Sequence, residues 1–184
     1  MGRWADREMG RRIEIHNCFP PSPHSPIPPS LWVSIILAAG FGAGFSPIVP
    51  GTAGTLVAIP FYYFISRIPS PVYEVTLVAF FFLSVFVSEK AERHWGKKDD
   101  RRIVIDEIMG FLLTMLWVPQ SILSIVAGFV LFRFFDIMKP FPIRRLEKVK
   151  SGFGVVLDDV LAGAYANITL HVILRILEDN LSIT

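Results

Sequence analysis

Six apolar segments, most of them too short to cross a bilayer upright, constrain this chain more than any other feature of its sequence. They are Leu31–Phe45, Thr55–Ile65, Val72–Val87, Ile103–Val118, Ile122–Met138 and Val155–Leu177. Because a helix needs roughly 20 apolar residues to span the hydrocarbon core, several segments are expected to be re-entrant or buried. The predicted fold class is all-α: a compact, membrane-embedded bundle of about six helices, four of them true spans.

Composition agrees with a membrane protein and excludes other classes. Hydrophobic residues make up 52% of the chain and charged residues 18%, whereas soluble domains carry about 25% charged residues. The net charge of +2 is too small to indicate a nucleic-acid partner. The single cysteine, Cys18, excludes an intramolecular disulfide and a cysteine-rich zinc site.

The first thirty residues differ from the rest of the chain. They contain the run CFPPSPHSPIPPS, in which prolines are too dense for a helix or a sheet. We expect residues 1–30 to be a Pro-rich disordered tail without a conventional signal peptide. The functional domain is expected to cover residues 31–184.

Basic residues predict how the helices are oriented. They gather in two segments, Ser88–Arg102 and Lys139–Lys150, while the turns near Pro69 and Pro119 carry almost none. The positive-inside rule places both basic segments in the cytoplasm and both turns outside. The segment Leu31–Phe45 is then expected to be re-entrant or interfacial, since a further span would break the alternation.

Acidic residues within the apolar segments are the candidates for chemistry, because ionisable groups at membrane depth are costly. Five are expected at the cytoplasmic helix ends: Asp106, Glu107, Asp136, Asp158 and Asp159. Together they could surround a hard cation such as Mg²⁺, which prefers oxygen ligands. Each adjacent pair could instead serve as a favourable charge in a first helical turn. Neighbouring helical residues diverge by about 100°, so both members of a pair are not expected to point alike. A sixth acid, Glu74, is expected at the opposite membrane face.

Asp136 is the hardest acid to explain structurally, because a helix C-terminus disfavours a carboxylate. An ion pair with Lys139 is the alternative to a functional role. The following run, KPFPIRR, is expected to present Lys139, Arg144 and Arg145 on a loop, where they suit phosphate oxygens. The segment GFGAGFSPIVPGTAGT could cradle a phosphate through Thr52 and Thr55, or could form a kink in a packed helix.

Four blocks in order resemble the phosphatidylglycerophosphatase A family: GFGAGFSPIVPGTAGT, IVIDEIMGF, FRFFDIMKPFPIRRLEKV and GFGVVLDDVLAGAYANI. The resemblance covers Leu31 to Leu177. It implies removal of the terminal phosphate of phosphatidylglycerophosphate with Mg²⁺ as cofactor, giving phosphatidylglycerol. It also implies an anionic phospholipid as partner and a bacterial-type inner membrane as location, with the active site on the cytoplasmic face.

The resemblance and the residue chemistry together give a set of expected roles. The expected metal ligands are Asp106, Glu107, Asp136 and Asp159; the catalytic residues are Asp136, Asp158 and Asp159; the phosphate-binding residues are Lys139, Arg144, Thr52 and Thr55. Attack by water and attack by a carboxylate both remain open. The alternative function is a membrane ion or metal transport protein that uses the same acids, and the sequence does not indicate an oligomeric state.

Overall fold

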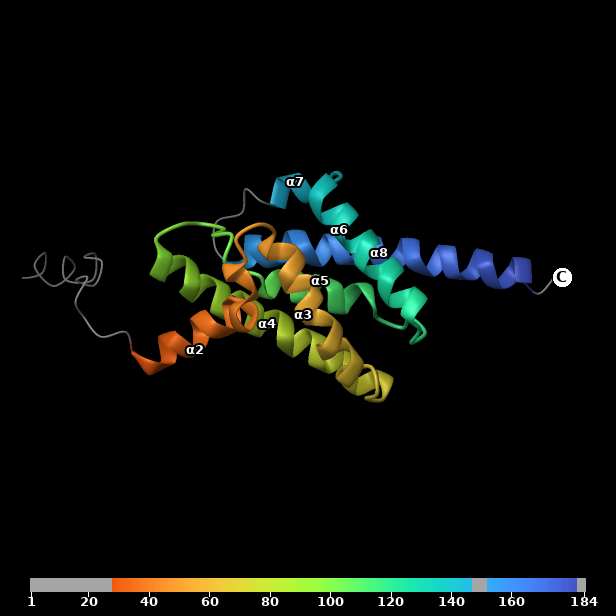
Figure 1. The fold of residues 1–184 in the computed structure, drawn as a ribbon, viewed down its shortest axis with the longest axis horizontal. Helices are drawn as coiled ribbons and strands as arrows, with labels where there is room; N and C mark the ends of the chain where they lie inside the picture. The colour runs from red at the N-terminus through yellow and green to blue at the C-terminus, as the bar shows by residue number, and fades with distance from the viewer. Residues whose placement is uncertain (1–27, 147–151, 182–184) are drawn as a thin grey trace, which may run out of the picture.

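The structure, a computed structural model, describes residues 28–146 and 152–181, and in these residues the regular elements are all helices (Figure 1). They are α2 (Pro29–Ala38), η2 (Gly40–Phe45), α3 (Pro50–Ile65), α4 (Ser70–Trp95), α5 (Ile105–Thr114), α6 (Ile122–Met138), α7 (Ile143–Leu146) and α8 (Gly152–Leu181). The predicted all-α class is confirmed. Residues 1–27 of the Pro-rich tail, and Lys148 and Lys150 of the second basic segment, lie outside the described residues.

Each of the six apolar segments contains a helix, but two regions of the chain differ from the expectation. The first segment breaks at Gly40–Gly42, where Gly40, Phe41 and Gly42 have φ of 53°, 56° and 105°; glycine adopts this region at little cost. In the second case, α4 continues to Trp95, so most of the expected loop Ser88–Arg102 is helical. Gly96, with φ of 64°, ends α4 because it adopts the left-handed conformation that caps helices.

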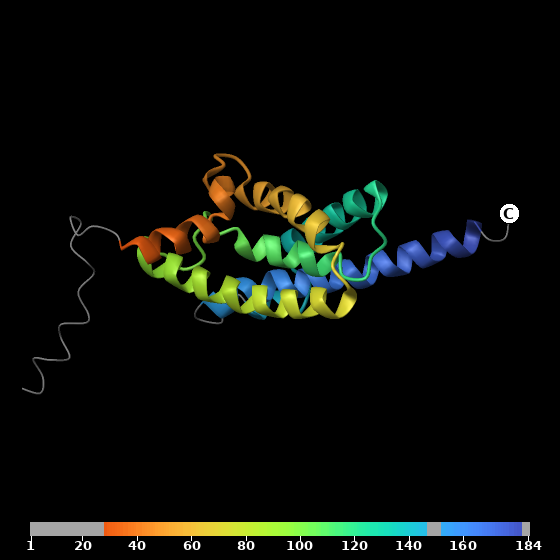
Figure 2. The ribbon, with the colours of Figure 1, turned by 90° about the horizontal axis from the view of Figure 1, so that it is seen from below.

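Helix α5 is the core of the bundle. It has only ten residues, and eight of them are buried, as expected for a helix that is apolar on nearly every side. It packs against α3, α4 and α8, and Figure 2 shows it between α3 above and α4 below. Functional groups at its ends are therefore held inside the bundle.

Glycines bring the backbones of α5 and α8 into contact. A Cβ atom added to Gly163 would overlap the carbonyl oxygen of Gly110, and one added to Gly110 would lie 2.7 Å from the carbonyl oxygen of Asp159. The Thr114 hydroxyl lies 2.9 Å from the Gly110 carbonyl oxygen and 3.3 Å from that of Gly163. Small residues permit this approach, and it sets how the two helices align.

Within the part of the chain that the structure describes, α4 and α8 are the two helices long and apolar enough to cross a membrane. By their 16 and 17 residues, α3 and α6 extend about 24 and 26 Å, less than the roughly 30 Å hydrocarbon core. Large apolar side chains such as Val75, Val130 and Val172 are more than half exposed. An apolar outer surface of this kind suits lipid rather than water, so the structure is compatible with a membrane-embedded bundle.

The two ends of the bundle differ in chemistry. At one end the turns near Pro69 and Pro119 meet, because Trp117 Nε1 donates to Glu74 Oε1 at 3.0 Å. Glu74 is thus far from the other acids along α4, as expected. The opposite end gathers the C-termini of α4 and α6 and the N-termini of α5 and α8 (Figures 1 and 2). Both basic segments begin at that end.

The close contact between α5 and α8 generates a stability prediction. Gly163→Ala improves helix propensity by about 1 kcal/mol, but its new methyl group overlaps the Gly110 carbonyl. We expect a net loss of about 1–3 kcal/mol, measured as a lower unfolding temperature in detergent. A higher unfolding temperature would show that the two backbones are not in contact.

Candidate active site

Asp106 and Glu107 lie in the first turn of α5, which the core holds in place. Asp106 is 5% exposed, and its Oδ1 accepts a hydrogen bond from the Glu107 backbone N–H at 3.1 Å. A carboxylate is favoured in a first turn. The favourable first-turn position helps to explain how the two acids are tolerated in a buried place. It does not occupy most of the carboxylate oxygens as hydrogen-bond acceptors.

Asp158 and Asp159 come from the interior of α8, not from its first turn. The helix begins at Gly152 and has no acid in its first turn, so favourable placement at a helix N-terminus does not account for this pair. The two residues are 6% and 4% exposed. Buried carboxylates outside a first turn require partners, and the partners of the two residues are different.

Asp159 joins the α5 acids in one cluster. An oxygen from each of Asp106, Glu107 and Asp159 lies within 4.8 Å of the other two. Both members of the Asp106–Glu107 pair therefore reach one point, contrary to the expected divergence. The longer glutamate side chain allows this. For Asp158 and Asp159 the expected divergence is correct, because Asp158 turns away to Lys139, whose Nζ lies 2.8 Å from Asp158 Oδ2.

The cluster fits a hard divalent cation. All three residues offer carboxylate oxygens, the ligands that Mg²⁺ prefers. Glu107 Oε2 is buried and has no hydrogen-bond partner within residues 28–146 and 152–181. Burying several like charges without compensation is costly, and a cation placed among the three carboxylates would offset that cost.

Asp136, the fourth expected ligand, lies beside this cluster, where its carboxyl group is within hydrogen-bonding reach of Asp159. Its ion-pair partner is Arg133 on the preceding turn of α6: Arg133 Nη1 lies 2.6 Å from Asp136 Oδ2. The alternative expected for Asp136 was a pair with Lys139. The ion pair to Arg133 links Asp136 to the interior of the site.

Arg133 is the residue that sequence reasoning missed. Its side chain is only 18% exposed, and its Nε is buried without a hydrogen-bond partner in the described part of the chain. The signal was present, since Arg133 is the only charged residue in the apolar run before Asp136. A lone ionisable residue in such a run marks a functional position by default.

The Gly-rich segment contributes a close backbone contact at Gly51. A Cβ atom at Gly51 would overlap Glu107 Oε1 and would lie 3.1 Å from Arg133 Nη1. The first turn of α3 therefore packs closely against these two side chains. The segment thus brings a third helix to the acidic cluster.

The four expected phosphate-binding residues lie in different settings. Thr52 is half-buried beside Gly51, whereas Thr55 is fully buried and donates its hydroxyl to the Gly51 carbonyl at 2.9 Å. Lys139 ends α6 and, with Arg144, lines an apolar pocket of about 500 Å³. Arg144 is exposed, and its Nη2 donates to the Met138 carbonyl at 3.3 Å.

The loop expected after Asp136 is partly helical. Arg144 and Arg145 lie on α7, a single turn, rather than on an extended loop. The Ile143 side chain is completely buried, and its N–H donates to the Pro140 carbonyl at 2.8 Å. This apolar anchor fixes the turn, so the two arginines are presented from a defined position.

Comparison with known proteins identifies a family model and several relatives that match the chain. A family model described as phosphatidylglycerophosphatase A matches residues 36–174. Phosphatidylglycerophosphatase A of Escherichia coli K12 is 39% identical over 130 residues, 70% of this chain and 76% of that protein. Its namesake in Haemophilus influenzae Rd is 39% identical over 144 residues, 75% of this chain and 86% of that protein.

A third relative carries a different name. A Bacteroides thetaiotaomicron protein described as a candidate phosphatidylinositol-3-phosphatase is 38% identical over 149 residues, 77% of this chain and 93% of that protein. No solved structure matches the chain. The family match covers the helices that carry all five acids and Arg133, and on these grounds the chain belongs to the phosphatidylglycerophosphatase A family.

Proposed function

We propose that this protein hydrolyses the terminal phosphomonoester of phosphatidylglycerophosphate, giving phosphatidylglycerol and inorganic phosphate, with Mg²⁺ as cofactor. The observation that supports the proposal best is the cluster of Asp106, Glu107 and Asp159, with oxygens within 4.8 Å of one another, in a chain of this family. The reaction takes place at the cytoplasmic face of a bacterial-type inner membrane, since both basic segments begin at the same end of the bundle as the acids.

Asp106, Glu107 and Asp159 hold the cation. When bound, Mg²⁺ neutralises charge on the phosphoryl oxygens and polarises the phosphorus. The two carboxylates of α5 and the one of α8 can act together only because the glycine contact keeps the helices aligned.

Two partly buried cations, Arg133 and Lys139, bind the phosphoryl oxygens from the other side. Arg133 has one nitrogen on Asp136 and an Nε without a partner among the described residues, and the planar guanidinium fork matches phosphate geometry. Lys139 is oriented by Asp158. In this proposal Asp136 and Asp158 hold these cations in position. Arg144 lies at the edge of the pocket that Lys139 also lines. Thr52, in the first turn of α3, contributes a hydroxyl, while Thr55 supports that turn through the Gly51 carbonyl.

In the reaction, a P–O bond to the incoming oxygen forms while the P–O bond to glycerol breaks. The proton of the attacking water passes to the departing glycerol oxygen. Asp136 lies next to the cluster but is not one of the three acids that form it. It is therefore placed to relay this proton. Direct attack by Asp136 on phosphorus is the other route, and it would give a transient aspartyl phosphate.

A second lipid deserves a direct comparison, because the Bacteroides relative matches over 93% of its length. Phosphatidylinositol 3-phosphate also joins a terminal phosphomonoester to a lipid phosphodiester. The transport alternative is less favourable, since family membership makes the chain a phosphatase. Release of phosphate separates a hydrolase from a transporter.

The experiment that tests the proposed function measures phosphate release from phosphatidylglycerophosphate in mixed micelles, with phosphatidylinositol 3-phosphate in parallel. We expect faster release from phosphatidylglycerophosphate, loss of activity with EDTA, and recovery with Mg²⁺, because the donor set is oxygen only. Full activity after exhaustive chelation would contradict the metal assignment. Preference for the inositol lipid would reassign the substrate.

Removing one cluster charge is expected to abolish turnover. Asp159→Asn keeps the side-chain shape but removes a cation ligand, so kcat should fall about 100-fold or more. The control is Glu74→Gln, which changes an acid at the opposite end of the bundle and should retain activity. If both variants turn over at the wild-type rate and elute as folded protein, Asp159 is not in the site.

Arg133 gives a separate prediction. Arg133→Gln should lower kcat/KM about 100-fold or more, because a buried donor to the phosphoryl group is lost. Arg133→Lys should recover part of the loss, since it keeps the charge but not the fork. Arg175→Gln, an exposed arginine of α8 at the other end, is the matched control. A normal kcat/KM in folded Arg133→Gln would show that Arg133 only pairs with Asp136.

A further inference from the structure

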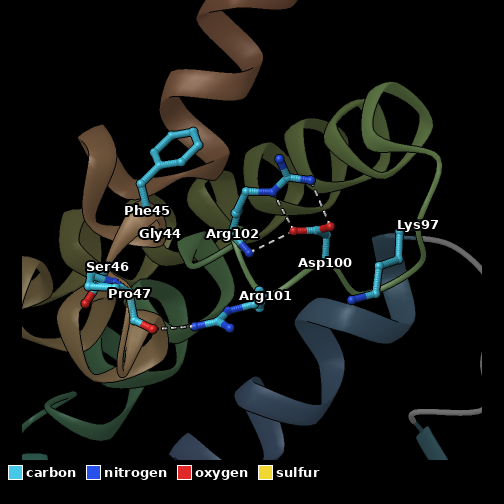
Figure 3. Close-up of a pocket in the computed structure, with 8 residues that line it drawn as sticks. All are labelled: Gly44, Phe45, Ser46, Pro47, Lys97, Asp100, Arg101 and Arg102. Atoms are coloured by element: carbon cyan, nitrogen blue, oxygen red, sulfur yellow. Dashed lines mark hydrogen bonds and ion pairs between the residues drawn. The ribbon is translucent and has the colours of Figure 1, made fainter.

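A second pocket, distinct from the acidic cluster, opens beside the Gly-rich segment (Figure 3). Its volume is about 400 Å³, within the range of sites that bind small ligands. One wall is Gly44–Pro47 and the other is Asp100–Arg102, with Lys97 completing the lining. Three cationic side chains and one acidic side chain give the lining a net charge of +2, which suits an anion.

The cations of this pocket are held in place differently. Arg102 donates to both oxygens of Asp100, at 2.7 and 3.0 Å, and stacks 4.2 Å above the Trp95 ring. The hydrogen bonds from Arg102 hold the pKa of the Asp100 carboxyl below its usual value, so this pair stays ionised and self-compensated. Lys97 and Arg101 therefore supply the charge that is available to a ligand.

Arg101 also connects the two walls. Its Nη2 donates to the Pro47 carbonyl at 3.1 Å, which leaves other N–H groups of the guanidinium free to bind. Gly44 is required opposite, because a Cβ atom there would overlap the Arg102 carbonyl oxygen. In Figure 3 the two walls face each other across this contact, with Arg101 pointing to Pro47. The pocket is thus a built feature, not a chance gathering of surface charges.

Both walls lead directly into the acidic site. Pro47 precedes Gly51 by four residues, and Arg102 precedes Asp106 by four. An extended residue covers at most about 3.6 Å, so the Cα atoms at the two sites are no more than about 14 Å apart along either path. Gly51 itself packs against Glu107. The two sites are therefore close neighbours along both segments.

The surface around the pocket is apolar. Phe45 lines it and is 59% exposed, and the neighbouring Ile48 is 83% exposed. Cationic groups beside exposed apolar side chains match a phospholipid at the membrane surface, where the headgroup adjoins the acyl chains. A soluble phosphate would gain nothing from this apolar border.

We propose that the pocket formed by Gly44–Pro47 and Lys97–Arg102 binds the phosphodiester of the lipid substrate, the phosphate that hydrolysis leaves in place. The inference rests on the proposed function, because the terminal phosphate occupies the acidic site at the same time. Lys97 and Arg101 bind the diester oxygens. The pocket selects lipids that carry a phosphodiester next to the phosphomonoester, and it disfavours phosphatidic acid, which lacks the diester.

The test compares two double variants with the same loss of charge. Lys97→Gln with Arg101→Gln should raise KM for phosphatidylglycerophosphate about tenfold, with kcat changed less than about twofold. Lys90→Gln with Arg93→Gln removes two cations of α4 outside the pocket and should leave KM unchanged. Arg101→Lys, which keeps the charge, should restore most of the affinity and covers the case of a poorly folded double variant.

A binding measurement separates this inference from the proposed function. Calorimetry with the water-soluble diester glycerophosphoglycerol should show binding to the wild-type protein and about tenfold weaker binding to the pocket variant. Binding of inorganic phosphate should be the same in both. These results would stand even if phosphatidylglycerophosphate were not hydrolysed.

Three results would overturn the inference while leaving the hydrolase intact. Equal KM increases in both double variants would show general attraction to the anionic membrane. Weakened binding of inorganic phosphate would show a site for free phosphate. A tenfold KM increase in Arg144→Gln, without one in the pocket variant, would place the diester in the pocket beside Lys139.

Discussion

Repulsion among buried carboxylates is the constraint on which the rest of this structure depends. Asp106, Glu107 and Asp159 converge within 4.8 Å beside a large apolar core. Such a group is stable only with nearby positive charge or a bound cation. The surrounding architecture supplies part of that charge through Arg133 and Lys139, each held on its own aspartate. The remaining negative charge is what makes the cluster suitable for a divalent cation.

The helices are packed so that these charges cannot move apart. Gly110 and Gly163 let α5 and α8 touch along their backbones, and Gly51 lets α3 close on Glu107 and Arg133. A larger side chain at Gly110 or Gly163 would separate α5 from α8, both of which carry site residues. The close helix contacts at these glycines therefore hold the polar side chains of the site in a preorganised arrangement. The short helix α5 takes part in all three glycine contacts.

Much of the fold could be predicted from the sequence because apolar length and turn residues are local signals. The six apolar segments, the separation of Glu74 from the other acids, and the location of the other five acids toward one end of the bundle follow from such signals, whereas the convergence of Asp106 with Glu107 does not. The partners of individual side chains could not be predicted, because they depend on helix rotation and long-range packing. This is why the pairs Asp136–Arg133 and Asp158–Lys139 emerged only from the structure. The contact of Gly51 with Glu107 could not be predicted for the same reason.

Arg133 could have been identified from the sequence, because it is a lone cation inside an apolar segment. The basic run after Asp136 favoured Arg144 as the phosphate-binding arginine. The structure places Arg144 on the exposed turn of α7. A single cation inside an apolar segment is rarer than a cation in a basic loop, and it therefore carries more information. Continuation of α4 to Trp95 was missed for a different reason, since a charged amphipathic helix end resembles a loop in composition.

The most direct test of this account is the binding of Mn²⁺, a spectroscopic substitute for Mg²⁺, followed by electron paramagnetic resonance in detergent-solubilised protein. The wild-type protein should bind Mn²⁺ with a signal that saturates and that Mg²⁺ displaces. Asp106→Asn, folded to the same degree, should lose that signal, because a ligand of the cluster is gone. Saturable Mn²⁺ binding of equal strength in wild type and Asp106→Asn would contradict the assignment of the three carboxylates as the metal site.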